Sequence, residues 1–358
     1  MEIIITSPSL DPQKNVSGIS SVTKFIIENN VYYRYIHFEL GKRDNEKGGI
    51  FRIFPVMKSI FRWDILLSRF PNAIVHYNFP LSKASIIRDS LFIWLARMRK
   101  HKIVIHIHGG IFLTSSHIPI YLNYILKKIF SLPISFIVLS EMEKEILINK
   151  FDCKKVFILP NCINLSEAII FHRTVNYENP LTIGYLGRIT ETKGMDYLLD
   201  ACIRMKEIGI NFSLKLAGKE EIINQYLPKF KEKLGEQFIY CGIVSGKTKL
   251  NFLKSLDVFV LPSFFEGLPM SLIECMSFGV VPVVTNVGSV REIIRDGYNG
   301  LFIKVKDSNT ITQQIIKLNA DRNLLQCFSQ NAKDFIVHNF NVRKYINTLN
   351  DIYAFINS

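Results

Sequence analysis

Short apolar runs alternate along the chain with longer stretches in which apolar and polar positions recur with a helical period. Runs that are apolar at nearly every position are typical of strands covered on both faces, and the longer stretches are typical of amphipathic helices. The first series of predicted strands is Ile3–Thr6, Tyr35–Phe38, Ala73–His76, Ile103–Ile107, Phe136–Leu139 and Val156–Ile158. The second series is Leu181–Tyr185, Phe212–Leu216, Phe238–Tyr240, Val258–Leu261, Val281–Val284 and Gly300–Ile303. The predicted helices include Ser85–Arg99, Met195–Ile208, Thr248–Leu256 and Val342–Ile356.

This alternation predicts α/β domains built on doubly wound parallel sheets. Two series in a chain of 358 residues predict two Rossmann-like domains. The segment 166–180 between them lacks a clean period and contains Asn176, Asn179 and Pro180, so we place the boundary there. We expect a first domain over residues 1–170, a second over 180–340, and a C-terminal helix over 341–358 that can cross back to the first domain.

The composition is that of an ordinary globular protein, with 48% hydrophobic and 21% charged residues. The first residues, MEIIITSPS, lack the basic stretch of a secretory signal, and no apolar run approaches the roughly 18 residues of a membrane span. The 6 cysteines are scattered without a C-x-x-C pair. This favours reduced, mostly buried thiols in a cytoplasmic protein over a zinc site.

Positive charge is concentrated in the first half of the chain. The net charge is +13, and residues 42–128 alone hold 15 lysines and arginines against 4 aspartates and glutamates. Such a field favours a negatively charged partner, although solvated helix faces are the plainer interpretation. Nucleic acid is not expected, because no zinc finger, helix-turn-helix or RNP-type strand accompanies the charge.

The segment Phe51–Phe70 is the candidate contact for an anionic membrane. If it is helical beyond Pro55, Lys58, Arg62 and Arg69 lie along one face. We expect its apolar residues elsewhere on the circumference, with Trp63 and the phenylalanines adding bulk that favours an interface. They are Met57, Ile60, Phe61, Ile65 and Leu67. A helix lying in the plane of an anionic bilayer and a partly buried helix with cations reaching to solvent both fit.

The stretch Pro262–Val283 carries the strongest chemical signal. Glu266 follows the apolar run DVFVLPS, and Gly267-Leu268-Pro269 leads into a helix predicted to start near Met270. A turn from strand to helix presents backbone N–H groups and the positive end of the helix dipole, which suits phosphate. Glu274, one turn further along the helix, can accept hydrogen bonds from vicinal hydroxyls.

A second stretch, Thr182–Ala201, places cations at the end of another predicted strand. The strand ends at Gly187, Arg188 follows, and Lys193 precedes an amphipathic helix. A guanidinium and an ammonium around one strand exit can converge on a single diphosphate.

These stretches, with GRITETKGMDYLLDA and DVFVLPSFFEGLPMSLIECMSFGVVPVV, resemble the donor half of glycosyltransferase family 4. The resemblance is dense over residues 180–304 and sparse in the first domain. It implies the GT-B fold, in which two Rossmann-like domains face a central cleft that closes over the donor. It also implies a retaining transfer of sugar from a nucleoside-diphosphate sugar to an acceptor hydroxyl.

The resemblance also assigns roles in the second domain. Arg188 and Lys193 would neutralise the donor diphosphate as it leaves, Glu266 would hold sugar hydroxyls, and Glu274 would bind the ribose. The amides of a short segment after Glu266 would cradle sugar and phosphate, and these residues are Gly267, Leu268, Pro269, Met270 and Ser271. The base would be bordered by Gly242, Ile243 and Val244.

In the first domain the resemblance is carried by shorter motifs. NVSGISSV places Gly18 after the first strand, similar to a glycine loop that lets the backbone approach donor phosphate or acceptor. In IVIHIHGG, His108 matches the family's histidine beside the reacting sugar, whereas we expect His106 on the opposite strand face with a structural role. Ser140, Glu141 and Asn161 match family positions more loosely.

No D-x-D motif occurs in the chain, so we expect no essential metal and no cofactor. Two side-chain cations and helix-terminal amides can stabilise the departing diphosphate instead. The two glutamates are assigned to hydroxyl binding, which argues against a glycosidase-like double displacement. A same-face mechanism, in which the leaving phosphate helps to deprotonate the acceptor, fits better.

The expected acceptor is a glycan or an undecaprenyl-diphosphate-linked oligosaccharide in bacterial surface polysaccharide synthesis, such as O-antigen or capsule. The protein would be cytoplasmic and peripheral on the inner face of the plasma membrane. Alternatives are a nucleotide-sugar 2-epimerase of similar architecture and a catalytically inactive membrane-bound scaffold. A dinucleotide-dependent dehydrogenase would need G-x-G-x-x-G after the first strand, which SPSLDPQKNVSGIS does not provide.

Overall fold

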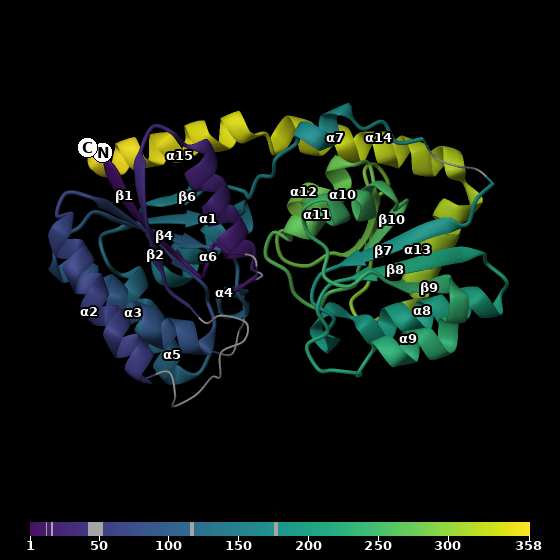
Figure 1. The fold of residues 1–358 in the computed structure, drawn as a ribbon, viewed down its shortest axis with the longest axis horizontal. Coiled ribbons are helices and arrows are strands. Elements are labelled where there is room, and N and C mark those ends of the chain that lie inside the picture. The colour runs from purple at the N-terminus through teal and green to yellow at the C-terminus, as the bar shows by residue number, and fades with distance from the viewer. Residues whose placement is uncertain (12, 16, 42–52, 115–117, 175–177) are drawn as a thin grey trace. The chain divides into compact units, whose positions relative to one another are not determined.

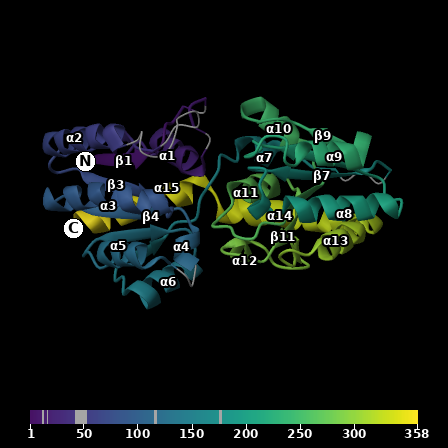
Figure 2. The ribbon, with the colours of Figure 1, turned by 90° about the horizontal axis from the view of Figure 1, so that it is seen from below.

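The computed structural model describes residues 1–358 except 12, 16, 42–52, 115–117 and 175–177. It divides into two compact units (Figures 1 and 2). Unit 1 comprises Met1–Cys162 together with Val342–Ser358, and unit 2 comprises Ile163–Asn341. Val16 of the predicted glycine loop, Phe51 and Arg52 of the amphipathic segment, and Asn176 lie outside the described residues.

Unit 1 is a six-stranded sheet with the strand order β2-β1-β3-β4-β5-β6, in which all pairs are parallel. Its strands are β1 (Glu2–Ser7), β2 (Arg34–Glu39), β3 (Ile74–Phe79), β4 (Ile103–Ile107), β5 (Ser135–Val138) and β6 (Val156–Ile158). Its helices are α1 (Gly18–Asn29), α2 (Ile53–Arg69), α3 (Lys83–Met98), α4 (Ile111–Thr114), α5 (Ile120–Phe130), α6 (Glu141–Phe151) and α15 (Val342–Asn357).

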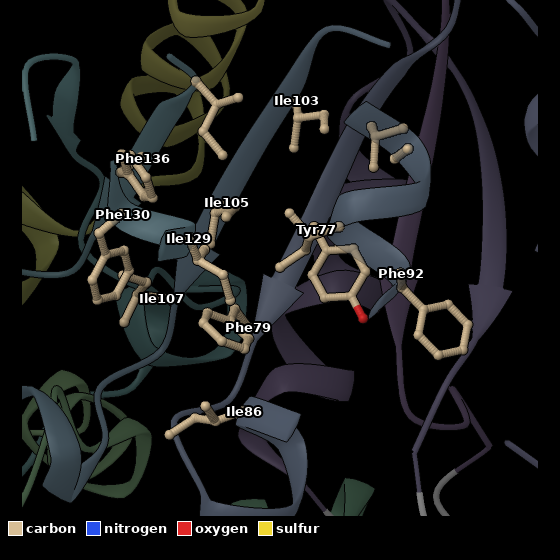
Figure 3. Packing of buried hydrophobic residues seen from close by; sticks show 14 of the residues in the cluster. Tyr77, Phe79, Ile86, Phe92, Ile103, Ile105, Ile107, Ile129, Phe130 and Phe136 are labelled. Atoms are coloured by element: carbon tan, nitrogen blue, oxygen red, sulfur yellow. The ribbon is translucent and has the colours of Figure 1, made fainter. Parts of the chain in front are cut away.

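One face of this sheet is covered by a dense apolar core. Tyr77 and Phe79 of β3 pack with Phe92 of α3 and Phe130 of α5 (Figure 3). α2 contributes Trp63, which is fully buried and donates its indole N–H to the carbonyl of Phe92 at 3.0 Å. α1 and α15 pack on each other, and buried polar residues of β3 contact side chains of both helices.

Unit 2 repeats the architecture with the strand order β12-β11-β10-β7-β8-β9, again all parallel. Its strands are β7 (Leu181–Leu186), β8 (Phe212–Ala217), β9 (Phe238–Tyr240), β10 (Val258–Leu261), β11 (Val281–Thr285) and β12 (Leu301–Ile303). Its helices are α7 (Ser166–Ile170), α8 (Met195–Glu207), α9 (Leu227–Leu234), α10 (Gly246–Lys254), α11 (Met270–Ser277), α12 (Val290–Ile293), α13 (Ser308–Ala320) and α14 (Arg322–Asn339), with short 3-10 turns η2 (Glu191–Lys193) and η3 (Gly235–Gln237). α8 packs on α13, and α11 packs on α14.

The structure confirms the predicted fold class and every predicted strand to within a few residues. The third strand shows the largest shift, because β3 runs from Ile74 to Phe79 and continues through the polar residues His76 and Asn78. α7 forms inside the segment that showed no period. Within the described residues, no helix is long and apolar enough to span a membrane.

The amphipathic segment is helical beyond Pro55, but the expectations for Trp63 and for three of its other apolar residues are wrong. α2 begins at Ile53, with Pro55 in its first turn, where proline is tolerated. Trp63 is a core residue rather than an interface residue, because it lies on the buried side of the helix. Met57, Phe61 and Ile65, which we expected away from the cations, are exposed on the same side as Lys58 and Arg62.

Candidate active site

The strand order locates a candidate ligand site in each unit. In unit 2, the chain after β7 continues outward to β8 and β9, whereas β10 lies on the other side of β7 and leads to β11 and β12. β7 and β10 therefore flank the point where the winding direction reverses, and ligands of such sheets bind beyond the carboxyl ends of the strands there. Arg188 and Lys193 follow β7, and Glu266 follows β10.

Glu266 is held firmly in the turn after β10. Its side chain is nearly buried, and its Oε1 accepts hydrogen bonds from Ser263 Oγ at 2.6 Å and from Lys193 Nζ at 2.5 Å. Gly288 packs against its backbone, because a Cβ at Gly288 would lie 1.8 Å from the carbonyl oxygen of Glu266. The structure thus brings together two of the residues that the sequence predicted to act together.

A tight glycine turn brings Lys193 to this position. Gly194 has a φ of +75°, and a Cβ there would lie 2.2 Å from the carbonyl oxygen of Pro262, so η2 and the end of β10 can approach only through glycine. Arg188 is anchored through its main chain, since Tyr185 Oη donates to its carbonyl oxygen at 2.5 Å. The Arg188 side chain is exposed and available to a ligand.

Glu274 lies on α11 and pairs with a cation that the sequence reasoning missed. Lys249 of α10 places its Nζ 2.7 Å from Glu274 Oε1, and both side chains are partly exposed. The two residues are 25 positions apart, so no local pattern connects them. One signal in the sequence could have indicated Lys249 as a donor-site residue. It lies in the helix that follows Gly242–Val244, the segment predicted to border the base.

The remaining predicted donor-site residues border the same end of the sheet. Gly267–Pro269 form the turn into α11, and Met270 and Ser271 form its first turn. The first amides of a helix have no acceptor within it. Gly242 follows β9, and its carbonyl oxygen accepts from the Gly218 amide at 2.8 Å. Ile243 is exposed, whereas Val244 is half-buried.

In unit 1 the corresponding reversal lies between β1 and β3, and the side chains that meet there around Asn78 are uncharged. Asn78 near the end of β3 contacts Thr6 of β1, Thr23 of α1 and His108 after β4. A cavity of about 240 Å³ opens here, lined by residues that include Thr6, Asn78 and Arg88. Gly18 begins α1, capped by Ser17, and a Cβ on Gly18 would meet no described atom within 4 Å.

His108 and His106 lie together, which corrects the expected orientation of His106. Their ring centroids are 4.0 Å apart with an interplanar angle of 33°. Residues two positions apart in an extended segment project to the same side, and His108 continues the direction of β4. Burial lowers the pKa of His108 to about 3, and burial also lowers the pKa of His106 well below its usual value.

Of the three loosely matched family positions, Ser140 has a clear structural role. Ser140 caps α6 by accepting the Glu143 amide at 3.2 Å, and it is fully buried. Glu141 is exposed in the first turn of that helix, and Asn161 is buried near the end of the first segment of unit 1.

The chain is similar to glycosyltransferases of known sequence and structure. Residues 166–335 match the model of the family glycosyl transferases group 1. The UDP-Gal:alpha-D-GlcNAc-diphosphoundecaprenol alpha-1,3-galactosyltransferase of Escherichia coli is 25% identical over 83% of this chain and 79% of its own. Sucrose-phosphate synthase from Thermosynechococcus elongatus superimposes with a TM-score of 0.77 at 16% identity, over 99% of this chain and 98% of its own.

HepE of Anabaena, in complex with UDP-glucose, superimposes with a TM-score of 0.76 at 14% identity, over 99% of each chain. At such identities the likeness establishes the fold. Residues 166–335 are therefore similar to the glycosyl transferases group 1, and the chain as a whole has the two-domain fold of the GT-B glycosyltransferases.

Proposed function

We propose that the protein is a retaining glycosyltransferase of family 4 that moves a sugar from a nucleoside diphosphate to a hydroxyl of a glycan or lipid-linked acceptor. The observation that carries the proposal is the convergence of Lys193 and Glu266 at the reversal point of unit 2, inside the matched glycosyltransferase domain. The acceptor class is supported by the Escherichia coli relative, whose name specifies a diphosphoundecaprenol substrate.

Each charged group of unit 2 has a part in this reaction. Lys193 and Arg188 supply positive charge to the diphosphate as its bond to the sugar breaks, with Arg188 able to donate as a fork. Glu266 accepts from sugar hydroxyls, and its position is maintained by Ser263 and Lys193 together. Glu274, held by Lys249, accepts from the ribose hydroxyls.

The proposed chemistry needs no metal ion and no cofactor. Lys193, Arg188 and the amides at the start of α11 provide the charge stabilisation that a divalent cation supplies in other transferases. The departing phosphate then takes the proton of the acceptor hydroxyl on the same face of the sugar, which retains the anomeric configuration. Glu266 binds hydroxyls in this scheme and is not a nucleophile.

The test of this function is nucleoside diphosphate release that depends on an acceptor. Thermal melting with UDP, GDP, ADP and CMP, each with and without EDTA, first identifies the base. A ligand at about 100 times its Kd adds roughly 2.7 kcal/mol to stability. Transfer from the matching sugar nucleotides to a diphosphoundecaprenol-linked GlcNAc is then followed, and NMR of the product gives its anomeric configuration.

We expect transfer with retention in the wild type and its loss in Glu266→Gln. Free sugar formed without any acceptor product would indicate a hydrolase instead. Conversion of the donor to its 2-epimer would support the epimerase alternative, and binding without turnover would support the inactive scaffold.

An anionic membrane surface is the proposed location, and three helices of unit 1 support it. α2, α3 and α5 pack side by side (Figures 1 and 2). Their outward sides carry large exposed apolar residues, namely Phe54, Met57, Phe61, Ile65, Ile87, Leu91, Trp94, Met98, Ile120, Tyr121 and Tyr124. An apolar surface of this kind on a globular protein marks an interaction site.

The charge of these helices selects an anionic bilayer as the partner. Exposed cations lie among the apolar residues, including Lys58, Arg62 and Lys127. The only acids of the three helices are Asp64 and Asp89, and both are paired with arginines at 2.6 and 2.5 Å. Basic residues flanking apolar side chains suit insertion into a headgroup region.

Sedimentation with vesicles tests the membrane proposal. We expect binding to vesicles containing phosphatidylglycerol, weaker binding to pure phosphatidylcholine, and release by salt. Phe61→Ser combined with Trp94→Ser should weaken binding several-fold. Ile223→Ser in unit 2, which changes an apolar residue that is even more exposed, should leave binding unchanged. Equal binding by both variants, or none in the wild type, would contradict this surface.

A further inference from the structure

Asn78 has a side-chain orientation that the surrounding groups determine completely. It is buried near the end of β3, and its Nδ2 donates to the Thr6 carbonyl oxygen at 2.6 Å and to Thr23 Oγ1 at 2.9 Å. A main-chain carbonyl can only accept, so the amide nitrogen must face Thr6. The Asn78 main-chain N–H also donates to Thr6 Oγ1 at 3.1 Å, which holds the residue in register.

The orientation of Asn78 determines the tautomer of His108. With Nδ2 turned to Thr6, Oδ1 faces His108 and lies 2.6 Å from its Nε2. Because an amide oxygen only accepts, Nε2 must carry the hydrogen. Burial lowers the pKa of His108 to about 3, so the ring is neutral near pH 7 and Nδ1 holds a lone pair. Among the residues that the structure describes, none hydrogen-bonds to this Nδ1.

Neighbouring rings hold His108 in this position. The His106 ring lies against it in a tilted arrangement, and His106 Nδ1 lies 3.1 Å from His76 Nε2. His76 Nδ1 in turn lies 2.6 Å from Tyr353 Oη of α15. The same diagonal thus recurs between β3 and β4, joining His76 to His106 and Asn78 to His108.

We propose that Asn78 is a positioning residue that fixes His108 as the Nε2–H tautomer, so that Nδ1 accepts a hydrogen bond from a substrate hydroxyl. This inference rests on the proposed function and deepens it. A lone pair at Nδ1 attracts a hydroxyl donor and repels phosphate oxygens, which only accept. His108, held by Asn78, therefore binds a sugar or acceptor hydroxyl rather than the diphosphate in this part of unit 1.

Histidine NMR tests the tautomer independently of activity. Two-bond ¹H–¹⁵N spectra of ¹⁵N-histidine-labelled protein distinguish Nδ1–H, Nε2–H and the imidazolium, and His108→Gln assigns the signal. We expect Nε2–H in the wild type and a mixture of both tautomers in Asn78→Leu. An Nδ1–H tautomer in the wild type, or an unchanged pure Nε2–H signal in Asn78→Leu, would overturn the proposal.

Kinetics test the hydroxyl contact. Asn78→Leu should lower kcat/KM for transfer about tenfold, the effect of losing one neutral hydrogen bond, while the Kd of the nucleoside diphosphate stays unchanged. If wild-type transfer is measurable and Asn78→Leu has the same kcat/KM, the proposed hydroxyl contact of His108 is wrong. Absence of transfer by the wild type, with the expected NMR tautomer, would instead refute the proposed function and leave the role of Asn78 on His108 intact.

Asn78→Asp provides a second variant with a different signature, which keeps the test open if Asn78→Leu does not fold. One carboxylate oxygen keeps the acceptor for Nε2–H and stabilises the imidazolium, so the pKa of His108 rises. The other oxygen replaces Nδ2 and cannot donate to the Thr6 carbonyl oxygen, so we also expect this variant to be less stable than the wild type. Below the raised pKa, Nδ1 is protonated and cannot accept, so activity should fall toward acid pH, unlike in the wild type. The other titratable groups nearby are His76, His106, Tyr353 and the Arg88–Asp89 pair beside the cavity. An identical pH profile in both proteins would contradict the proposal.

Discussion

The two units have the same architecture but differ in the chemistry at the point where the winding of each sheet reverses. In unit 2 this point is charged, with the Lys193–Glu266 pair, the Lys249–Glu274 pair and exposed Arg188. In unit 1 the groups that meet at this point are uncharged, with Thr6, Thr23 and Asn78 around a histidine whose pKa is lowered to about 3 by burial. The charged residues beside them, Arg88 and Asp89, pair with each other. The same backbone geometry thus presents two kinds of site.

This difference in charge matches the two kinds of group in the proposed substrates, phosphates and hydroxyls. Phosphate oxygens need cations and helix-terminal amides, which unit 2 offers. Hydroxyls need neutral donors and acceptors in defined positions, which unit 1 offers. Substitutions that remove charge from unit 2 should therefore weaken phosphate binding or slow phosphate departure. Changes in the protonation of unit 1 should affect hydroxyl contacts or the stability of that unit.

Removing the positive charge of Lys193 or of Arg188 should have the largest effect on the rate of transfer. We expect Lys193→Ala and Arg188→Ala each to lower kcat at least on the order of 10²–10³-fold, as loss of one stabilising donor typically does. Lys317→Ala and Arg204→Ala, which change exposed cations of the same unit, serve as controls. Near-normal kcat in a folded Lys193 or Arg188 variant would remove the charged site from the mechanism.

Acidification should destabilise unit 1 more than unit 2. Burial lowers the pKa of His76 and His108 from 6.5 to about 3, so the unfolded chain binds protons in this window that the folded chain excludes. Stability therefore falls as the pH falls below 6.5, by about 2 kcal/mol for each histidine at pH 5.

Unit 2 contains His172 and His338, and both are exposed. Hydrogen exchange at pH 5 and pH 7, corrected for intrinsic rates, should show the loss of protection in the amides of unit 1. Equal losses in the two units would show that the buried histidines do not set this difference.

Lys249→Met should weaken binding of the nucleoside diphosphate more than it slows transfer. The substitution leaves Glu274 without its partner and free to move, and we expect the Kd to rise about tenfold by calorimetry. Lys247→Met on the same helix is the matched control, because Lys247 is exposed. A larger fall in kcat than in affinity would place Lys249 in the transfer step instead.

Removing divalent cations should have no effect. We expect kcat and the Kd of the nucleoside diphosphate to be unchanged after dialysis against EDTA, because side chains and amides supply the positive charge of unit 2. Loss of activity with EDTA and recovery with Mg²⁺ or Mn²⁺ would show that the cations of unit 2 are insufficient.

The sequence predicted the sheets well because strands buried on both faces are apolar at nearly every position. It also predicted Glu266 and Lys193, since each lies directly beside a strand end. It missed Lys249, Asn78 and Tyr353, which reach their partners across 25, 30 and 277 residues. Trp63 was misassigned because residue type alone does not indicate which side of an amphipathic helix is buried. That side is determined by how the helix packs on the rest of the unit.

The division of the chain has a consequence for synthesis on the ribosome. Unit 2 is continuous from Ile163 to Asn341, whereas unit 1 is completed by α15, which follows it in the chain. Tyr353 and Asn350 of α15 hydrogen-bond to His76 and Asn30 inside unit 1. Unit 2 can therefore fold while unit 1 still lacks these contacts. Until α15 has been synthesised, the first sheet lacks the contact that Tyr353 makes with His76. A chaperone would be most needed during this interval of translation.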